Sequence, residues 1–459
     1  MKLHPSTQQR PAPAITARGT VAVGRTARTA QQGSVLIIVL WVCIGLVSIA
    51  LYFANTMTYE LRASDNRVSG CAADQAIEGA ARYVSLVLQN FATNGAVPDP
   101  SYYHAEAVPV GDAKFWIIGR NQTEDNSSEI AYGLIDEGGK LNLNSVSTNI
   151  LQYLPNMITD FTEAVLDWRG TNGSGNLNYA SLGYAPKYAP FETVDELRLV
   201  YGATTEFLVG EDLNRNGVLD PNEKDLNSNG QLDPGLFEYT TVYTREPNDS
   251  TTLTNVSTAR RSQLEGLFQS ANLSTKYVQA ITNGNNRPYT GMLKFAQVCK
   301  NAGMSADDFA HIANWVTTTN STYFRNRVNI NTANADVLTA LFMGAGIDEQ
   351  TALSAAKTMI TYRRQNPTML TSVYWMLTAL GNSEVVNALV SRDWVTTHSY
   401  QFTADVAAVG PLGRGYRRVK FIFDVSDGTP KILYRQDLSR LGWALGEKTR
   451  QNLVAKETQ

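Results

Sequence analysis

Cysteine and histidine are scarce in this sequence. The 459 residues include three cysteines, Cys43, Cys71 and Cys299, and this number does not suit a disulfide framework. Because Cys43 lies within an apolar run, the pairing left open is Cys71 with Cys299. No Gly-x-Ser-x-Gly or metal-protease motif occurs, and the histidines after residue 33 are isolated: His104, His311 and His398. The sequence therefore predicts no enzyme active site.

Acidic residues are absent from the first 33 residues, which contain five basic ones: Lys2, Arg10, Arg18, Arg25 and Arg28. Such a positive flank keeps the N-terminal end of a membrane protein in the cytoplasm. The formal net charge of the chain is −3, and loss of these five positive charges leaves −8. This balance does not favour nucleic-acid binding through a basic surface.

Charged residues are missing from the stretch that follows. Residues 34–54 (SVLIIVLWVCIGLVSIALYFA) are apolar without interruption. About 21 residues, each adding about 1.5 Å, roughly match the ~30 Å hydrocarbon core of a bilayer, whereas a cleaved signal peptide has a shorter apolar core. We therefore expect a single-pass membrane anchor with the body of the protein on the far side.

Proline is absent between residues 34 and 96, so nothing forces a break after the apolar run. Residues 55–98 place apolar side chains at helical spacing, which predicts one long helix whose second part packs on a domain. The residues expected on its apolar face are Leu61, Val68, Ala72, Ala76, Ala80, Tyr83, Val84 and Val87.

The N-terminal pattern resembles the type IV pilin class: Gly33, then SVLIIVLWV, a spanning helix and an amphipathic continuation. The resemblance implies that a prepilin peptidase removes residues 1–33 by cutting between Gly33 and Ser34, with methylation. Most members of the class have Glu at the fifth residue after the cut, where this sequence has Ile38. A carboxylate in lipid is costly, so a subunit with no neighbour above it can lack one.

The missing Glu, the VLWV stretch and the long chain are together similar to the K class of minor pseudopilins of type II secretion systems. This resemblance implies a subunit at the tip of a periplasmic pseudopilus, which helps initiate and cap its assembly for protein secretion across the outer membrane. The implied partners are the I-type and J-type minor pseudopilins, the prepilin peptidase and the inner-membrane platform, with no nucleic acid. The implied location is the inner membrane, with a cytoplasmic N-terminus and a periplasmic body.

Strand-like segments stand at both ends of the body, at residues 114–119, 129–136, 399–409, 416–425 and 431–436. We expect an α+β fold in which a pilin-like antiparallel sheet forms from residues 99–139 and 396–445 and packs against the long helix. A large, mainly helical insert would occupy residues 140–395, and residues 446–459 would form a tail.

The insert contains an internal repeat. Residues 140–154 (KLNLNSVSTNILQYL) align with residues 327–341 (RVNINTANADVLTAL), and further helical segments follow each copy. The Asn-x-Asn-[Ser/Thr] start is expected to supply a helix N-cap.

Both copies resemble SAM or helix-hairpin-helix modules, the second with a glycine hairpin at Gly344 to Ile347. Modules of the latter kind commonly bind DNA phosphates. Asp348 and Glu349 follow the glycines and would repel phosphate, and the first copy has no glycine hairpin. We therefore favour a packing role for the repeat over DNA binding.

Residues 211–235 (EDLNRNGVLDPNEKDLNSNGQLDPG) carry explicit metal-site chemistry. They place oxygen donors at positions 1, 3, 5, 7, 9 and 12 of a calcium loop, with Gly217 at the sixth position for the sharp turn. The donors are Asp212, Asn214, Asn216, the backbone carbonyl of Val218, Asp220 and Glu223, the last as a bidentate ligand.

The same frame recurs thirteen residues later, with Asp225, Asn227, Asn229, Gln231 and Asp233 as donors. Its twelfth position is Leu236, so a second ion would need another ligand, for which Glu223 or Asp220 is the candidate. We expect one or two structural Ca²⁺ ions in a stapled pair of loops, with Kd values of about 10⁻⁴ to 10⁻³ M. A solvated Asn/Asp/Gly loop without metal is the alternative.

Two other functions remain open at this stage. A membrane-anchored DNA receptor would use the helix-hairpin-helix stretch and bind DNA in a salt-sensitive way. A secreted calcium-binding protein would lose the apolar run on cleavage of a signal peptide.

Overall fold

The computed structural model describes residues 32–120, 129–170, 179–249 and 251–455. The chain divides into two compact units, Met1–Ser64 and Asp65–Gln459. The expected leader, residues 1–33, lies outside the described residues except for its last two positions, which open the first helix.

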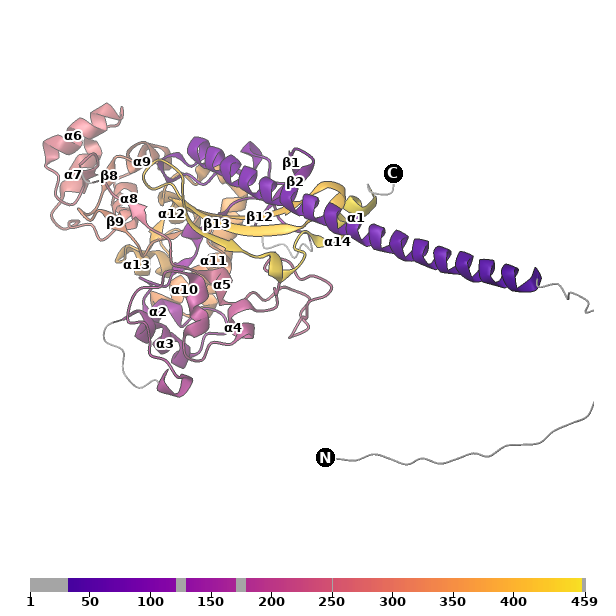
Figure 1. The fold of residues 1–459 in the computed structure, drawn as a ribbon. Coiled ribbons are helices and arrows are strands. Elements are labelled where there is room, and N and C mark those ends of the chain that lie inside the picture. Colours follow the sequence, from indigo (N-terminus) through magenta and orange to yellow (C-terminus); the bar gives the residue numbers. More distant parts are fainter. Residues whose placement is uncertain (1–31, 121–128, 171–178, 250, 456–459) are drawn as a thin grey trace, which may run out of the picture. The chain divides into compact units, whose positions relative to one another are not determined.

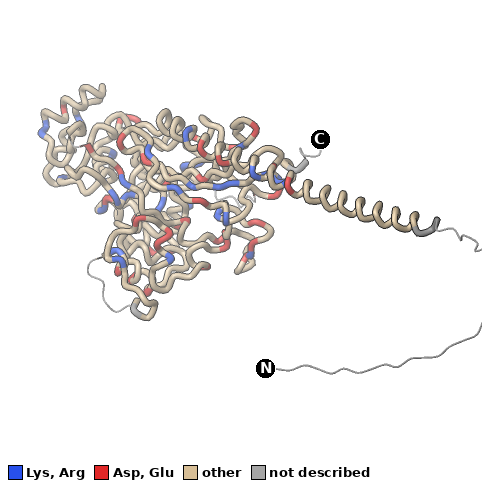
Figure 2. Tube along the Cα trace, in the orientation of Figure 1, with Lys and Arg blue, Asp and Glu red and all other residues tan. Residues whose placement is uncertain are grey.

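Helix α1 spans Gln32–Phe91, and the boundary between the two units falls within it. Residues 35–59 carry no charge, as the tan colour of this part of α1 in Figure 2 indicates. Within the described part of the chain, α1 alone is long and apolar enough to cross a membrane, with a mean hydropathy of 2.8 in its most apolar window. The predicted apolar helix is thus confirmed in length and composition.

The helix ends at Phe91, before the predicted limit at residue 98. Asn94 and Gly95 have φ values of 55° and 76°, which belong to the left-handed region and cannot continue a right-handed helix. No proline or glycine lies between Phe91 and Gly95 to mark this stop in the sequence.

In the second unit, α1 packs along the sheet through a row of small side chains. Ala73, Ala76 and Ala80 are fully buried there, and Val84 and Leu88 continue the same row. Small side chains let the helix backbone approach the sheet closely. Leu61 and Val68, which were predicted on the same face, are instead 65% and 64% exposed.

The sheet joins the two ends of the body, as predicted. Its strand order is β1-β2-β12-β13-β14, and β3 pairs with β12 beyond the end of β2, all antiparallel. The strands are β1 Val108–Val110, β2 Ala113–Ile118, β3 Ile135–Asp136, β12 Gln401–Val409, β13 Arg417–Asp424 and β14 Lys431–Asp437. Phe115 lies opposite Ala408, so segments far apart in sequence are neighbours in space (Figure 1). The α+β class with a helical insert is confirmed.

The predicted strand at residues 129–136 is shorter than expected. Tyr132 makes an isolated bridge with Ile118, and regular pairing resumes only at β3. Gly133 between them has a φ of 154°, a conformation outside the β region of L-residues, which interrupts the ladder.

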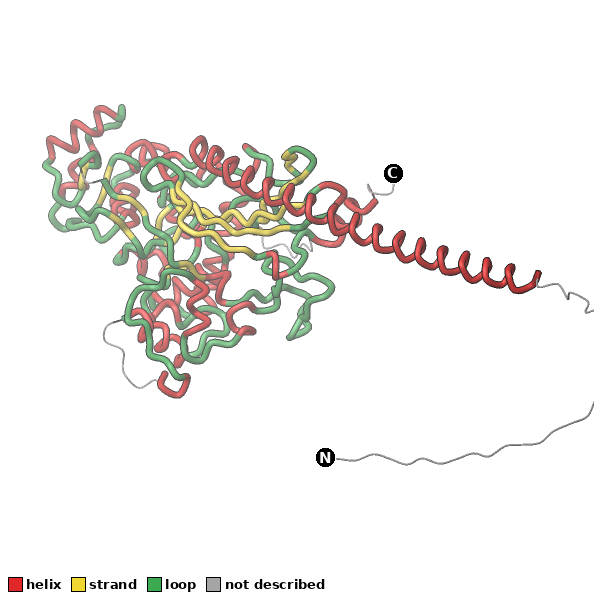
Figure 3. Tube along the Cα trace, viewed as in Figure 1, coloured by secondary structure: helices red, strands yellow, loops and turns green. Residues whose placement is uncertain are grey.

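Both faces of the central strand β12 are covered. Phe402, Ala404 and Val406 face α1, and all nine residues of the strand are buried. The opposite face carries polar side chains, among them Thr403, which donates to Glu137 Oε1, and Asp405, which accepts from Arg418 on β13. Figure 3 shows the yellow strands of the sheet beside the red helix α1, with the loops and helices of the insert adjoining.

The described residues of the insert form three copies of one arrangement, one more than the repeat recognised in the sequence. Each copy begins and ends with a two-residue strand, and these two strands pair in parallel: β4 with β5, β7 with β8, and β10 with β11. The first copy comprises β4 Leu141–Asn142, α2 Thr148–Leu151, α3 Thr159–Arg169, α4 Thr205–Val209, α5 Leu236–Tyr239 and β5 Thr240–Thr241. The second comprises β7 Thr254–Asn255, α6 Arg261–Ser270, α7 Lys276–Thr282, α8 Met292–Asn301, α9 Ala306–Ala313 and β8 Val316–Thr317. The third comprises β10 Val328–Asn329, α10 Ala335–Gly344, α11 Glu349–Gln365, α12 Tyr374–Leu380, α13 Glu384–Val390 and β11 Val395–Thr396.

The same side-chain contacts hold each copy closed. In each copy, the side-chain oxygen of the Asn in the first strand accepts a hydrogen bond from the backbone N–H two residues later in the sequence. The second strand of each copy ends with a Thr, and the side-chain amide of the same Asn donates to the third residue after that Thr. These pairs are Asn142 with Thr244, Asn255 with Asn320, and Asn329 with Ser399. In each copy an arginine also donates to the backbone carbonyl four residues after that Asn: Arg169 to Val146, Arg287 to Ala259, and Arg363 to Ala333.

The predicted N-cap role of the Asn-x-Asn motif is wrong. Asn142 and Asn329 form turns that bind the N–H groups of Asn144 and Asn331, and these turns precede the helices. The N-cap of α10 is Asn334, whose side chain accepts from Val337 N–H. The motif is therefore the closing contact of a copy and not a helix cap.

The remaining elements link these parts. Strands β6 Glu246–Pro247 and β9 Tyr323–Phe324 pair antiparallel, and α14 Gly446–Ala455 lies in the expected tail. Cys71 and Cys299 are both free, so the pairing left open by the sequence is not formed.

Candidate calcium-binding loops

The metal-site segment, residues 210–235, leaves the first copy after α4 and returns to it before α5, and we call it the calcium excursion. We call the pairing of its two ends, Gly210 and Pro234, the neck. Gly210 and Pro234 form an antiparallel bridge, and Gly235 N–H donates to Val209 O at 3.0 Å. A Cβ on Gly210 would lie 2.4 Å from Asp233 O, so only glycine permits this approach. The neck brings the ends of the two predicted calcium frames together.

The first loop, residues 212–223, wraps its predicted donors around one centre. The Asp212 carboxylate accepts from the N–H groups of Asn216 and Gly217 at 2.9 and 2.8 Å. Asn214 and Asn216 both donate their side-chain amides to the same oxygen of Asp220, at 2.6 and 2.9 Å. Four of the predicted donors therefore converge, and Val218 follows directly after the turn.

The second loop repeats this pattern contact for contact. Asp225 accepts from the N–H groups of Asn229 and Gly230, and Asn227 and Asn229 both donate to one oxygen of Asp233. Gln231 N–H donates to Asn229 Oδ1, as Val218 N–H does to Asn216. The backbone is repeated too, since Arg215 and Ser228 both have φ near 58° and the glycine two positions on has a positive φ in each loop.

In each loop a glutamate accepts hydrogen bonds from two backbone N–H groups, and we call it the basal glutamate of that loop. The basal glutamate of the second loop was not among the predicted donors. Glu223 accepts from Asn214 and Asp220 N–H in the first loop at 3.1 and 3.0 Å. In the second loop Glu211 accepts from Leu226 and Asp233 N–H at 2.6 and 3.0 Å. Glu211 thus occupies the place for which Glu223 or Asp220 was expected. Its only sequence signal is its position immediately before the first frame.

The electrostatics of the first loop suit a cation. Burial is the largest effect on Asp212 and raises its pKa, although the Arg120 guanidinium acts in the opposite direction. Burial also raises the pKa of Glu223, and the nearby carboxylates of Asp212 and Asp220 add to that rise. A bound divalent cation would offset the cost of holding these carboxylates together.

The donor set fits Ca²⁺ better than a transition metal. In the described residues, no group of three or more His, Cys, Asp or Glu side chains could hold a metal ion by itself. The loops instead combine carboxylates with Asn side chains and backbone carbonyls, the oxygen ligands that calcium takes. Asn214 and Asn216 would hold an ion through their amide oxygens, which requires the amides to turn from the orientation described here.

The residues around the predicted cleavage site lie near the start of α1. Gly33 and Ser34 lie in the first turns of α1, and Ile38 lies on the same helix, 60% exposed. Ile38 brings no polar group to that surface.

The glycine hairpin of the third copy is not arranged for phosphate. Gly346 has a φ of 97°, and Asp348, two residues on, accepts from Thr351 N–H at 3.0 Å as the N-cap of α11. This hydrogen bond lowers the pKa of the Asp348 carboxyl, which is therefore charged at neutral pH. The negative charge stands at the helix N-terminus that a phosphate would need.

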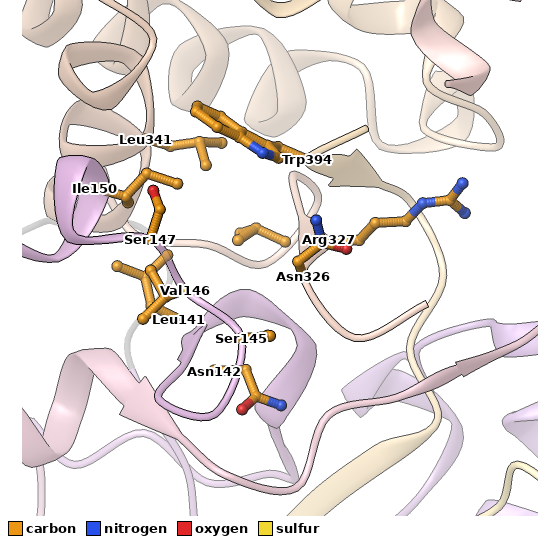
Figure 4. Close-up of a pocket in the computed structure, with 11 residues that line it drawn as sticks. Leu141, Asn142, Ser145, Val146, Ser147, Ile150, Asn326, Arg327, Leu341 and Trp394 are labelled. Atoms are coloured by element: carbon orange, nitrogen blue, oxygen red, sulfur yellow. The ribbon is translucent and has the colours of Figure 1, made fainter. Parts of the chain in front are cut away.

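A cavity of about 140 Å³ lies between the starts of the first and third copies (Figure 4). Ile150, Leu341 and Trp394 line one side of it, and Asn142 and Ser145 the other. The Arg327 side chain points out of the cavity, toward Glu246 and Asp393. Arg327, the charged residue among those described around the cavity, is therefore already paired with two carboxylates.

Comparison with known proteins finds similarity to a chain of one solved complex. No protein-family model matches the chain, and no curated protein matches it. A chain in the crystal structure of the GspK-GspI-GspJ complex from the enterotoxigenic Escherichia coli type 2 secretion system is similar, with a TM-score of 0.39 and 11% sequence identity. The similarity covers 79% of this chain and 96% of that chain. At these values the similarity carries no functional argument.

Proposed function

We propose that this chain is a membrane-anchored, pilin-like subunit, and more specifically a K-class minor pseudopilin at the tip of a type II secretion pseudopilus. The observation that carries the proposal is helix α1, which combines an uncharged, exposed first part with a second part packed along an antiparallel sheet. This is the arrangement that the N-terminal motif predicts for a pilin-like protein.

Two features support the tip position. Ile38 stands where most pilin-like subunits have a carboxylate that pairs with a neighbouring subunit, so this chain lacks the group for one such contact. The insert between β3 and β12 is also larger than the sheet that carries it. A tip subunit can carry such bulk because no other subunit stacks above it. I-type and J-type minor pseudopilins would be its partners.

The first prediction concerns processing. In cells with a prepilin peptidase, N-terminal sequencing of the mature protein from membranes should give a start at Ser34. In cells without the peptidase the chain should keep residues 1–33, and a Gly33→Leu variant should behave in the same way in peptidase-containing cells. As a control, Gly45→Leu, a glycine within the apolar part of α1 with no atom within 4 Å of its would-be Cβ, should be processed normally.

A mature start beyond residue 54 would instead indicate a secreted protein that has lost its apolar segment. An unprocessed chain in both cells would remove the basis for the pilin-like assignment. Salt-sensitive DNA binding by the chain would favour the receptor alternative.

We further propose that the two loops bind two structural Ca²⁺ ions in the periplasm. The support is the repeated set of contacts in both loops, with one basal glutamate each. Asp212, Asn214, Asn216, Val218, Asp220 and Glu223 would hold the first ion. Glu211, Asp225, Asn227, Asn229, Gln231 and Asp233 would hold the second.

The second prediction tests these basal glutamates. Isothermal titration of the purified full chain with CaCl₂ should give two ions per chain. Glu223→Gln and Glu211→Gln should each reduce the stoichiometry to one, because a neutral amide cannot act as a bidentate anionic ligand. Glu206→Gln, an exposed glutamate on the neighbouring helix α4, should retain two. Two ions in the Glu211→Gln variant would show that another residue serves the second loop.

A further inference from the structure

The two loops have the same internal contacts but different surroundings. In the first, Asp212, Asn214 and Asn216 are at least 95% buried. In the second, Asn227 and Asn229 are exposed. The first loop accepts hydrogen bonds from β13 of the sheet, whereas the hydrogen bonds described for the second loop lie within residues 210–235.

Arg418 on β13 makes the main docking contact. Its side chain is fully buried and forms a bidentate pair with Asp405 on β12, at 2.8 and 2.6 Å. The same guanidinium donates to two backbone carbonyls of the first loop, those of Asn214 and Arg215, the latter at 2.8 Å. These are the third and fourth positions of the loop, where Arg215 adopts its left-handed conformation.

Two further contacts hold the same segment. Arg120, which follows β2, also donates to Arg215 O, at 3.3 Å. A Cβ on Gly217 would lie 3.0 Å from the Arg120 side chain, so that arginine covers the sixth position of the loop. On the other side, the amides of Asn214 and Asn216 lie 3.4 Å from the carbonyls of Trp443 and Ala444.

The positive charges at this contact are compensated within the protein. Arg418 is paired with Asp405, and Arg120 with Glu238 at 2.9 Å. The two arginines therefore fix the loop backbone without presenting an unbalanced positive charge to a cation.

We propose that Arg418 is a positioning residue that makes the first loop the tighter of the two calcium sites. This inference rests on the proposed calcium function. A loop whose backbone is already held in its turn conformation loses less conformational freedom on binding an ion. Among the described residues, the second loop is held by its own contacts, by Glu211 and by the bridge between Gly210 and Pro234, and no arginine donates to its turn. We expect the first loop to bind calcium at least about 10-fold more tightly.

Calorimetric titration of the full chain in detergent micelles with CaCl₂ tests the proposal. The wild-type protein should show a tight and a weak class of site. Asp220→Asn should remove or weaken the tight class, and Asp233→Asn the weak class, which assigns each class to a loop. Arg418→Lys should weaken the tight class by about 10-fold and leave the weak class unchanged, because an ammonium cannot bind a carboxylate bidentately and two carbonyls at once. Arg435→Lys, an exposed arginine on β14, is the matched control and should change neither class.

Hydrogen exchange of the wild-type chain provides a second test that does not depend on the folding of a variant. Calcium should slow exchange in the first loop and in residues 443–446 at a lower concentration than in the second loop. Equal affinities in the wild type, or a folded Arg418→Lys protein with an unchanged tight class, would overturn the role of Arg418. Absence of any calcium binding by the wild type would overturn the proposed calcium function itself.

Discussion

Replacement of Gly415 by alanine should lower the free energy of unfolding of the body by about 3 kcal/mol or more. Gly415 lies in the turn between β12 and β13 and has a φ of 68°, a conformation that costs an L-residue about 1–2 kcal/mol. A Cβ there would also lie 2.4 Å from Gly70 N and Ser69 C, in the backbone of α1. Overpacking against a backbone adds about 1–3 kcal/mol. Chemical denaturation of the full chain in detergent micelles measures the effect.

Two other glycines separate these contributions. Gly428 has a φ of 80° but no atom within 4 Å of its would-be Cβ, so Gly428→Ala should show the conformational cost alone. Gly410 has an ordinary φ of −73°, and its Cβ would lie 2.2 Å from Ser69 O, so Gly410→Ala should show the steric cost alone. Equal effects of Gly415→Ala and Gly428→Ala would mean that the contact with α1 is not tight.

Replacement of Arg327 by methionine should cost about 3–5 kcal/mol at pH 7, the range for leaving a buried charge without its partner. The Arg327 side chain is 5% exposed, pairs with Glu246 at 3.2 Å and binds Asp393 at 3.0 and 2.8 Å. Its guanidinium also lies over the Phe324 ring, 3.3 Å from the centroid. The variant leaves two carboxylates without this counter-ion. Arg435→Met, which breaks an exposed pair with Glu78, should cost less than about 1 kcal/mol.

The pH dependence of this effect has a definite sign. Burial is the largest single effect and raises the pKa of Glu246, but Arg327 and His398 together outweigh it and lower that pKa to about 2 from an ordinary value of 4.5. In the wild type, the stabilisation from this depressed pKa is complete above pH 4.5 and is lost as the pH falls toward 2. Without Arg327 the pKa of Glu246 rises, and protonation removes the unpaired charge. The destabilisation by Arg327→Met should therefore be smaller at pH 4 than at pH 7. An equal loss at both values would contradict this account.

Local patterns in the sequence predicted the parts of the fold that depend on them. The run without charge or proline predicted α1, and alternating apolar residues predicted β2, β12, β13 and β14 close to their observed bounds. The spacing of the calcium frames is also local, and the structure brings their Asp and Asn side chains into contact, while calcium binding itself stays a prediction. The end of α1 at Phe91 was not predicted. The left-handed conformation near it begins at Asn94, which is not a glycine and therefore does not mark a helix end in the sequence.

Contacts between distant residues could not be predicted in this way. Arg418 reaches the first loop across about 200 residues of sequence, and nothing near it marks that role. Glu211 was not predicted because it directly precedes the first loop in the sequence, whereas its carboxylate accepts hydrogen bonds from the second loop. The second copy of the repeat was missed because Ser257 replaces the second Asn of the motif, although it still accepts from a backbone N–H, that of Tyr289.

The closures described above occur at three levels of the chain. The calcium excursion returns to its starting point at Gly210 and Pro234, the first copy returns to its own where β4 meets β5, and the whole insert leaves and rejoins the sheet where Asp136 lies opposite Phe402. In each case the two ends of the inserted segment lie side by side. Each segment can therefore be lengthened or replaced without altering the strand pairing of the part of the chain into which it is inserted. The molecule is therefore nested, and its inserted pieces can diversify while α1 and the sheet keep their form.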